Sequence, residues 1–215
     1  MSIDAPFTLA CAPPFLAVRF ARPQRALSWS LTHPGFALVR EIVWFEVKDR
    51  DLPPEVDAAA LLKRRLAEFG APEALGLMTA RDVRRHHQSA RRVEAVEARC
   101  VTTVGLMNAE RVGARRFTTP HAGTINTLVH VSCALTAGAL VEALSIAAEA
   151  RTAAILEARS GPAYTGTGTD CLVVVAPSEG PPADAAGLHT AIGEAIGGAV
   201  YDATREGVVA WDAER

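Results

Sequence analysis

The chain has 215 residues, of which 49% are hydrophobic and 21% charged, and its formal net charge is -2 at pH 7. This length and composition suit a single domain with a sizeable apolar core. The slight negative charge argues against a general nucleic-acid binder, because such proteins carry a clear basic surplus.

Neither a secretory signal nor a membrane span is predicted. The first twenty residues contain an aspartate and three prolines and have no basic start before an apolar run. The longest stretch without a charged residue, 117–141, holds two histidines and an asparagine that lipid would disfavour. Four cysteines lie far apart and lack zinc-site spacing, so we expect free thiols in a reducing, cytoplasmic compartment, without metal or membrane partners.

Short apolar or alternating runs, separated by proline and glycine, predict strands in the amino-terminal third. They lie at residues 16–20, 26–30 and 37–47. The tight breaks between them favour antiparallel pairing, since only antiparallel strands can be joined by a short turn.

Two helices are predicted next. Asp57 is expected to cap a helix that runs to about Phe69, with Gly70 just past its end. Thr79 is expected to cap a second helix. The basic run 84–92 then falls at an exposed helix end and turn, or forms a patch for an anionic ligand group.

The carboxyl-terminal half alternates strand-like and helix-like patterns. Strands are expected at 93–104, 124–133 and 172–176, and helices at 136–159 and 190–206. The order of the elements, with strands first and a mixture of strands and helices after them, predicts a single-domain α+β fold with a mixed β-sheet covered by helices. A strictly alternating α/β fold is the alternative.

The first candidate site is the segment 165–170, a threonine–glycine turn directly before an apolar strand. Thr167, Gly168 and Thr169 offer hydroxyls and close backbone approach to a ligand. The segment enters a strand and lacks a Gly-Lys-Ser/Thr ending, so it is not a typical phosphate loop. Asp170, at the junction, is predicted to anchor a ligand or orient a base.

The second is the mouth of the last helix. His189 lies where helix amides are unpaired and the helix dipole favours anions, which suits proton transfer or binding of an oxyanion. Thr190 and Glu194 are predicted substrate contacts in the same segment. Gly193, Gly197 and Gly198 are expected to serve close helix packing.

The third is one polar face of the 136–159 helix, where Glu149 and Thr152 follow Glu142 and Ser145. That face meets either solvent or a cleft, and a partly desolvated Glu149 there suits a general base. Asn126 begins a buried strand and needs hydrogen-bond partners, either in a turn or on a substrate amide.

Taken in order, these segments resemble the adenosylcobinamide amidohydrolase family over about residues 75–207. The strands at 15–47 diverge from the family pattern, Leu188 precedes His189, and Arg151 stands where lysine is usual. The chain is therefore identified as a member or a diverged member. The matching stretches are 75–80, 101–109, 123–126, 149–152, 165–170 and 187–197.

The resemblance implies an enzyme of corrinoid salvage in cobalamin biosynthesis. It would hydrolyse adenosylcobinamide to adenosylcobyric acid and aminopropanol, with the corrinoid as substrate and no cofactor. The alternatives are a non-catalytic corrinoid-binding paralogue and a phosphate-ligand enzyme that uses the threonine–glycine loop. The sequence is also compatible with a homo-oligomer.

For amide hydrolysis, Glu149 or Asp170 is predicted to activate water and His189 to protonate the leaving amine. Amides and hydroxyls of 167–169 would hold the oxyanion. A threonine nucleophile, Thr167 or Thr169, is the rival route, and a metal site rests on residue type alone. We expect the turn, the mouth of the last helix and the polar helix face to meet at one pocket.

Overall fold

The computed structural model describes residues 6–114 and 123–214. The principal helices are α1 (Ala58–Glu68), α2 (Ala137–Ala158) and α3 (Ala191–Ala213). The strands are β1 (Phe7–Ala12), β2 (Phe15–Trp29), β3 (Pro34–Glu46), β4 (Leu75–Thr79), β5 (His86–Val93), β6 (Val96–Val104), β7 (Ala109–Glu110), β8 (Ile125–Val131), β9 (Gly166–Thr167) and β10 (Cys171–Pro177).

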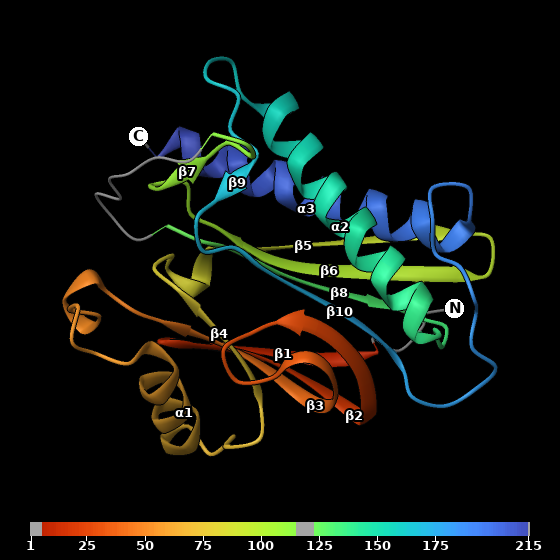
Figure 1. The fold of residues 1–215 in the computed structure, drawn as a ribbon, viewed down its shortest axis with the longest axis horizontal. Helices are drawn as coiled ribbons and strands as arrows, with labels where there is room; N and C mark the ends of the chain where they lie inside the picture. The colour runs from red at the N-terminus through yellow and green to blue at the C-terminus, as the bar shows by residue number, and fades with distance from the viewer. Residues whose placement is uncertain (1–5, 115–122, 215) are drawn as a thin grey trace.

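One mixed, eight-stranded sheet runs through the molecule in the order β4-β3-β2-β10-β8-β6-β5, with β1 also paired to β2. β8 lies parallel to β10 and β3 parallel to β4, while the other pairs are antiparallel. β7 and β9 form a separate small ladder. The predicted single-domain α+β fold with a mixed sheet is confirmed (Figure 1).

β2 connects the two halves of this sheet. Its first part pairs with β1, and its second part, from Gln24 to Ser28, pairs with β10. An irregularity between Arg19 and Gln24 shifts the register against β3 there. Two strands were predicted in this region, and they are one bent strand because the break at Arg22-Pro23 is absorbed within the ladder.

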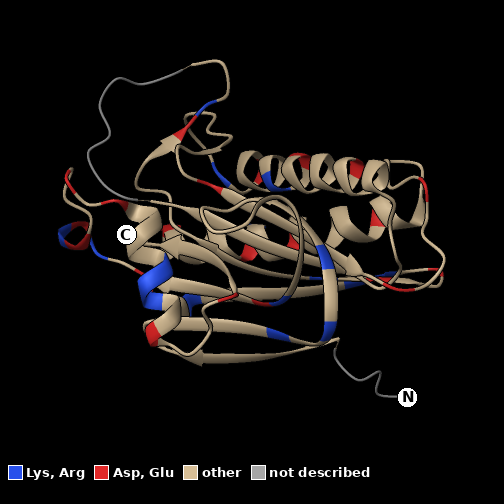
Figure 2. Cartoon of the chain, turned by 60° about the horizontal axis from the view of Figure 1, so that its bottom comes forward, with Lys and Arg blue, Asp and Glu red and all other residues tan. Residues whose placement is uncertain are grey.

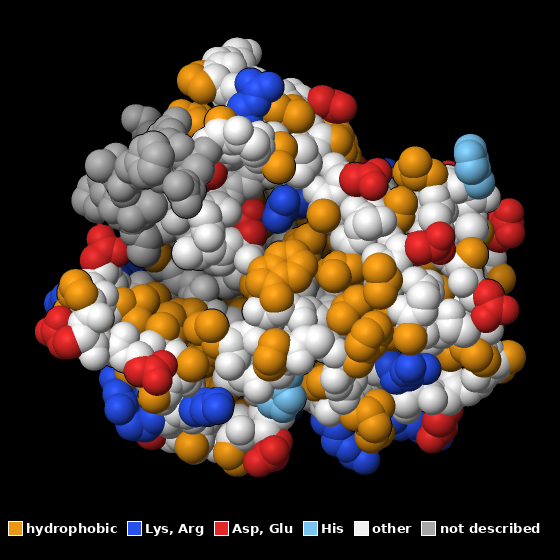
Figure 3. Space-filling view, in the orientation of Figure 1, with side chains coloured by type: hydrophobic (Ala, Val, Ile, Leu, Met, Phe, Trp, Pro, Cys, Tyr) orange, Lys and Arg blue, Asp and Glu red, His pale blue; other side chains and the backbone are white. Residues whose placement is uncertain are grey.

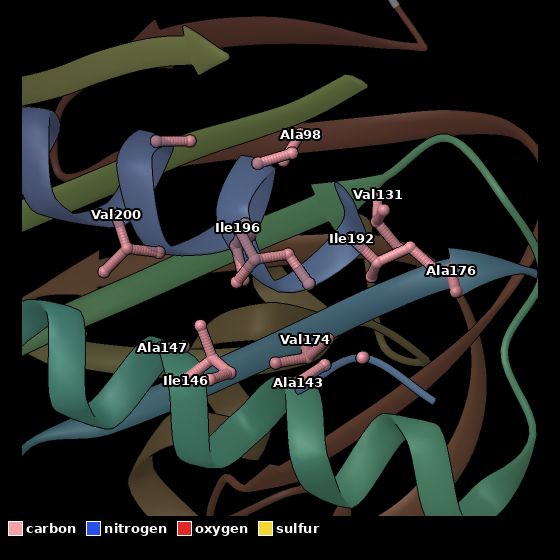
Figure 4. Close-up of a cluster of buried hydrophobic side chains, with 14 of the residues drawn as sticks. Ala98, Val131, Ala143, Ile146, Ala147, Val174, Ala176, Ile192, Ile196 and Val200 are labelled. Carbon is pink, nitrogen blue, oxygen red and sulfur yellow. The ribbon is translucent and has the colours of Figure 1, made fainter. Parts of the chain in front are cut away.

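The helices cover the sheet in two places (Figure 1). α2 and α3 share a core with β6, β8 and β10, built from small and branched side chains such as Ala143, Ile146, Val174 and Ile196 (Figure 4). A Cβ on Gly197 would lie 3.5 Å from Ile146, so this glycine serves the packing of α3 against α2 that was predicted for it. α1 packs against β3 at the far end of the sheet.

Most local signals are confirmed at the ends of helices. Asp57 accepts hydrogen bonds from two amides of α1, and Thr136 and Thr190 cap α2 and α3 in the same way. Gly70, after α1, has φ of 84°, a conformation that favours glycine. α3 extends beyond its predicted end at residue 206.

The helix predicted from Thr79 is wrong. Asp82 caps only a short 3-10 turn, Val83–Arg85, and the chain then continues as β5. β5 pairs with β6 across a tight turn at Glu94, whose φ is 52°. This non-local pairing outweighs the local helix signal, so the predicted exposed helix end is an edge strand.

The basic run 84–92 on this edge is not a free cationic patch. Arg91 pairs with Asp202 of α3 at 2.7 Å, and Arg92 pairs with Glu97 of β6 at 2.7 Å. Figure 2 shows acidic and basic residues interspersed along the chain. Across the described ranges, no helix has the length and apolar character needed to cross a bilayer.

Candidate active site

A cavity of about 400 Å³ lies where the end of β2 and the body of β4 meet the starts of β8 and β10. Figure 3 shows this side of the molecule hollowed, with apolar side chains gathered nearby. Most of the wall is apolar, and a few polar residues interrupt it. Those polar residues are Ser30, Thr124, Asn126, Thr169 and Asp170.

Asp170 fastens the threonine–glycine turn between β9 and β10. Its Oδ1 accepts from the Ile125 amide at 2.9 Å and from the Thr167 hydroxyl. Its Oδ2 accepts from the Thr167 amide and from Arg151 Nη1, both at 2.9 Å. A Cβ on Gly166 would lie 2.5 Å from this carboxylate, so the turn requires glycine there.

These contacts join three parts of the chain, because Ile125 begins β8 and Arg151 lies on α2. Burial raises the pKa of Asp170, while the charge of Arg151 and the hydrogen bonds from Thr167 and Ile125 oppose that rise. Among the described residues that line the cavity, Asp170 is the only carboxylate. Asp170 is therefore the anchor of the turn at the wall of the cavity.

Two hydroxyls stand side by side in the cavity wall. Thr169 Oγ1 donates to the Gly123 carbonyl at 2.8 Å and lies 2.7 Å from Thr124 Oγ1. Since the Thr169 proton is directed at Gly123, Thr124 is the donor within the pair. Asn126, also in the wall, donates from Nδ2 to the Met78 carbonyl at 2.7 Å and so joins β8 to β4.

The model of the adenosylcobinamide amidohydrolase family matches residues 4–215, nearly the whole chain. The chain belongs to this family. The predicted resemblance is confirmed, and it extends over the amino-terminal strands that were predicted to diverge. Membership makes the chain an amidohydrolase. A search of curated proteins returned no significant match.

Solved structures of similar shape share little sequence with this amidohydrolase. The PH0078 protein from Pyrococcus horikoshii OT3 is 12% identical, with a TM-score of 0.48 over 90% of this chain and 76% of its own. A beta-aminopeptidase from Burkholderia sp. is 13% identical, with a TM-score of 0.48 over 90% and 78%. The L-aminopeptidase D-Ala-esterase/amidase from Ochrobactrum anthropi is 11% identical, with a TM-score of 0.40 over 95% and 82%. Similarity at this level carries no inference about the chemistry of the family member described here.

The cavity brings together only some of the residues predicted for the amidohydrolase site. Asn126, Gly168, Thr169 and Asp170 line it. Thr167 binds Asp170 from the neighbouring side of the turn. Thr152 supports the turn from α2, because its hydroxyl donates to the Thr165 carbonyl at 3.1 Å.

The amino-terminal end of α3 lies away from this cavity. His189 is exposed there, Thr190 accepts from the Gly193 amide at 2.9 Å as the helix cap, and Glu194 is exposed in the first turn. The segment before them contacts α2 at Glu142, which accepts from the Ala186 amide at 2.7 Å.

This position follows from the direction of β10. The strand starts at the threonine–glycine turn and carries the chain away from it, by about 20 Å at ~3.3 Å per residue. Glu142 and Arg151, the α2 residues at the two ends, are nine positions apart, about 13 Å along a helix. The structure therefore does not bring His189, Thr190 and Glu194 to the cavity.

Glu149 is also placed outside the cavity wall, exposed on α2. Three groups of the cavity wall, Trp29, Ser30 and Thr124, were not predicted as site residues. Trp29, 46% exposed, donates from Nε1 to the Asp170 carbonyl at 2.6 Å. Thr124 was predicted only as the start of the strand 124–133 and as part of a stretch that matches the family. His121 and Ala122, which precede Gly123, lie outside the described residues.

Proposed function

We propose that this amidohydrolase cleaves the aminopropanol amide of adenosylcobinamide, giving adenosylcobyric acid and aminopropanol. One observation carries the proposal beyond family membership. The threonine–glycine turn, fastened by the buried Asp170, forms the polar side of a cavity whose remaining wall is largely apolar. Such a cavity suits an amide attached to a bulky apolar ring.

The side chains at the mouth of the cavity favour a corrin as that ring. Trp29 and Leu31 line it, and they are 46% and 51% exposed. The hydrogen bond from Trp29 to Asp170 fixes the indole in place. A cavity of about 400 Å³ is too small for a whole corrinoid. The corrin therefore lies across the mouth, against the exposed aromatic and aliphatic side chains, while the aminopropanol arm enters.

Hydrolysis requires a new C–O bond at the carbonyl carbon, cleavage of the C–N bond and a proton for the leaving nitrogen. Asp170 takes the proton of the nucleophile, which is either a bound water or the Thr167 hydroxyl that already donates to it. The protonated Asp170 then passes this proton to the amine. In the Thr167 route, water afterwards hydrolyses the ester.

The oxyanion has donors in the same turn. Among the described residues, the N–H groups of Gly168 and Thr169 donate no hydrogen bond. The Thr167 amide, in contrast, is already bound to Asp170. Two free amides beside the carbonyl carbon suit an oxyanion site, since charge develops on that oxygen during attack.

The test is incubation of the purified protein with adenosylcobinamide, with adenosylcobyric acid and aminopropanol measured by mass spectrometry. We expect turnover by the wild type and a loss of at least about 100-fold for Asp170→Asn. Asp184→Asn, an exposed carboxylate in the loop before α3, is the matched control and should retain activity. A corrinoid that remains bound and intact would favour the non-catalytic binding protein instead.

Two further variants test whether His189 and Glu149 have the catalytic roles predicted from the sequence. His189→Ala and Glu149→Ala should retain turnover, because both side chains are exposed and outside the cavity wall. Loss of activity in either would restore the role predicted from the sequence. A covalent adduct at 167, trapped by rapid quenching of the wild type and missing in Thr167→Val, would select the threonine nucleophile over water.

A further inference from the structure

Asn108 carries a buried amide group that the rest of the fold does not use. Its residue is 7% exposed, and its Oδ1 is buried without a hydrogen-bond partner among the described residues. Its Nδ2 is not among the fully buried atoms that lack a partner, and it donates no side-chain hydrogen bond to a described residue. A buried amide oxygen without a partner costs about 1–3 kcal/mol, so its presence there requires a physical reason.

The position of Asn108 points to the threonine–glycine turn. Asn108 directly precedes β7, and the next residue, Ala109, pairs with Thr167 of β9. In an antiparallel ladder this register sets Asn108 opposite Gly168. On its other side, a Cβ on Gly123 would lie 2.6 Å from Asn108 Oδ1. The amide therefore sits between two glycines.

Gly168 leaves open space in front of this amide. A Cβ there would lie 3.9 Å from Asn108 Nδ2, and no other heavy atom of the described residues outside its chain neighbours comes within 4 Å. Gly168 also lines the cavity, and its N–H donates to no described residue. The missing side chain thus leaves a gap between the cavity and the Asn108 amide, next to the free N–H groups of the turn.

We propose that Asn108 is a further catalytic residue, whose Nδ2 donates a hydrogen bond to the oxyanion of the tetrahedral intermediate beside the Gly168 and Thr169 amides. This inference rests on the proposed amide hydrolysis. The free amide is then a pre-oriented donor, which meets its partner only when negative charge forms on the carbonyl oxygen. The glycine at 168 keeps the space for that oxygen open.

The experiment uses steady-state kinetics on adenosylcobinamide. We expect Asn108→Ala and Asn108→Asp to lower kcat by about 100- to 1,000-fold, with KM changed less than about threefold, because a donor to the transition state alone is lost. Asn108→Asp keeps the shape of the side chain and replaces the donor with an acceptor. Circular dichroism and the thermal midpoint report whether each variant is folded.

Gly168→Ala tests the same site without altering Asn108. Its methyl group makes only an ordinary contact at 3.9 Å, so the fold should be kept while the oxyanion space is filled. We expect kcat to fall by at least about 100-fold at an unchanged thermal midpoint. Gly138→Ala on α2 is the matched control, since its nearest heavy atom also lies 3.9 Å away, and it should keep full activity.

The possible outcomes distinguish a failure of this inference from a failure of the proposed function. An active wild type with Gly168→Ala and folded Asn108 variants within about threefold of its kcat refutes the role of Asn108 alone. A raised KM at unchanged kcat also refutes it, because Asn108 would then bind substrate and transition state equally. A wild type without turnover refutes the proposed function, and this inference with it.

Discussion

Asp170→Asn is expected to destabilise the fold through the contacts of one buried carboxylate. The Asp170 side chain is 6% exposed and that of Arg151 is 14% exposed. The substitution keeps the size of the side chain, but removes the charge that Arg151 pairs with. An amide NH₂ at Oδ2 would also face the N–H groups of Arg151 and Thr167, donor against donor.

Removing one partner of a buried ion pair costs about 3–5 kcal/mol. At about 2–4 °C per kcal/mol for a chain of this size, the thermal midpoint should fall by roughly 6–20 °C. Urea denaturation gives the free energy of unfolding, and calorimetry gives the midpoint. Arg151→Met removes the cation and relieves the donor conflict. The double variant with Asp170→Asn should therefore lose about 2 kcal/mol less than the sum of the single variants.

The Arg159–Asp212 pair is the matched control, because its atoms lie 3.0 Å apart with side chains 28% and 38% exposed. Asp212→Asn should change the free energy of unfolding by no more than about 0.5 kcal/mol. Equal effects of Asp170→Asn and Asp212→Asn would refute the reasoning. So would strict additivity of Asp170→Asn and Arg151→Met.

Three further outcomes are expected. Burial lowers the pKa of His130 from 6.5 to about 4, so the unfolded chain takes up its proton first and stability is lost as the pH falls below 6.5. The free energy of unfolding should be about 2 kcal/mol lower at pH 5 than at pH 7, and His130→Leu should remove this difference. Gly193→Ala should lower stability by about 1–3 kcal/mol in urea denaturation, because its Cβ would lie 2.2 Å from the Gly187 carbonyl oxygen. A thiol-reactive dye should label the exposed Cys11 in the native protein, and Cys100 only after unfolding.

Each of these expectations has a clear contrary result. An acid sensitivity that survives in His130→Leu would assign it to other groups. A Gly193→Ala protein as stable as the wild type would mean that the first turn of α3 yields without cost. Rapid native labelling of Cys100 would mean that β6 opens readily, despite its place inside the sheet.

Local chemistry was enough to predict where helices begin. Asp57, Thr136 and Thr190 each cap a helix because the capping contact spans only two or three residues. Thr79 carries the same type of signal and starts no helix. There the competing interaction is the ladder between β5 and β6, whose partners are up to 17 positions apart, as in His86 and Thr103. A local pattern contains no information about such a partner.

The residues of the candidate site likewise separate into those that a local pattern predicts and those that only tertiary contacts bring together. Asp170 was predicted because a carboxylate at the start of an apolar strand is a feature of one short segment. Trp29 and Asn108 gave no such signal, since they meet the turn only through pairing of distant strands. His189 was assigned to the site from its place at a helix mouth, which says nothing about the end of the sheet at which that mouth lies.

The sequence by itself determined the family, the mixed fold class and the threonine–glycine turn with its aspartate, because ordered short motifs and local periodicity contain them. Tertiary structure alone decided which strand ends meet. β8 and β10 run parallel and β2 runs antiparallel to β10, so the end of β2 lies beside the starts of the other two. The cavity forms at that end, and the mouth of α3 is carried to the opposite one by β10.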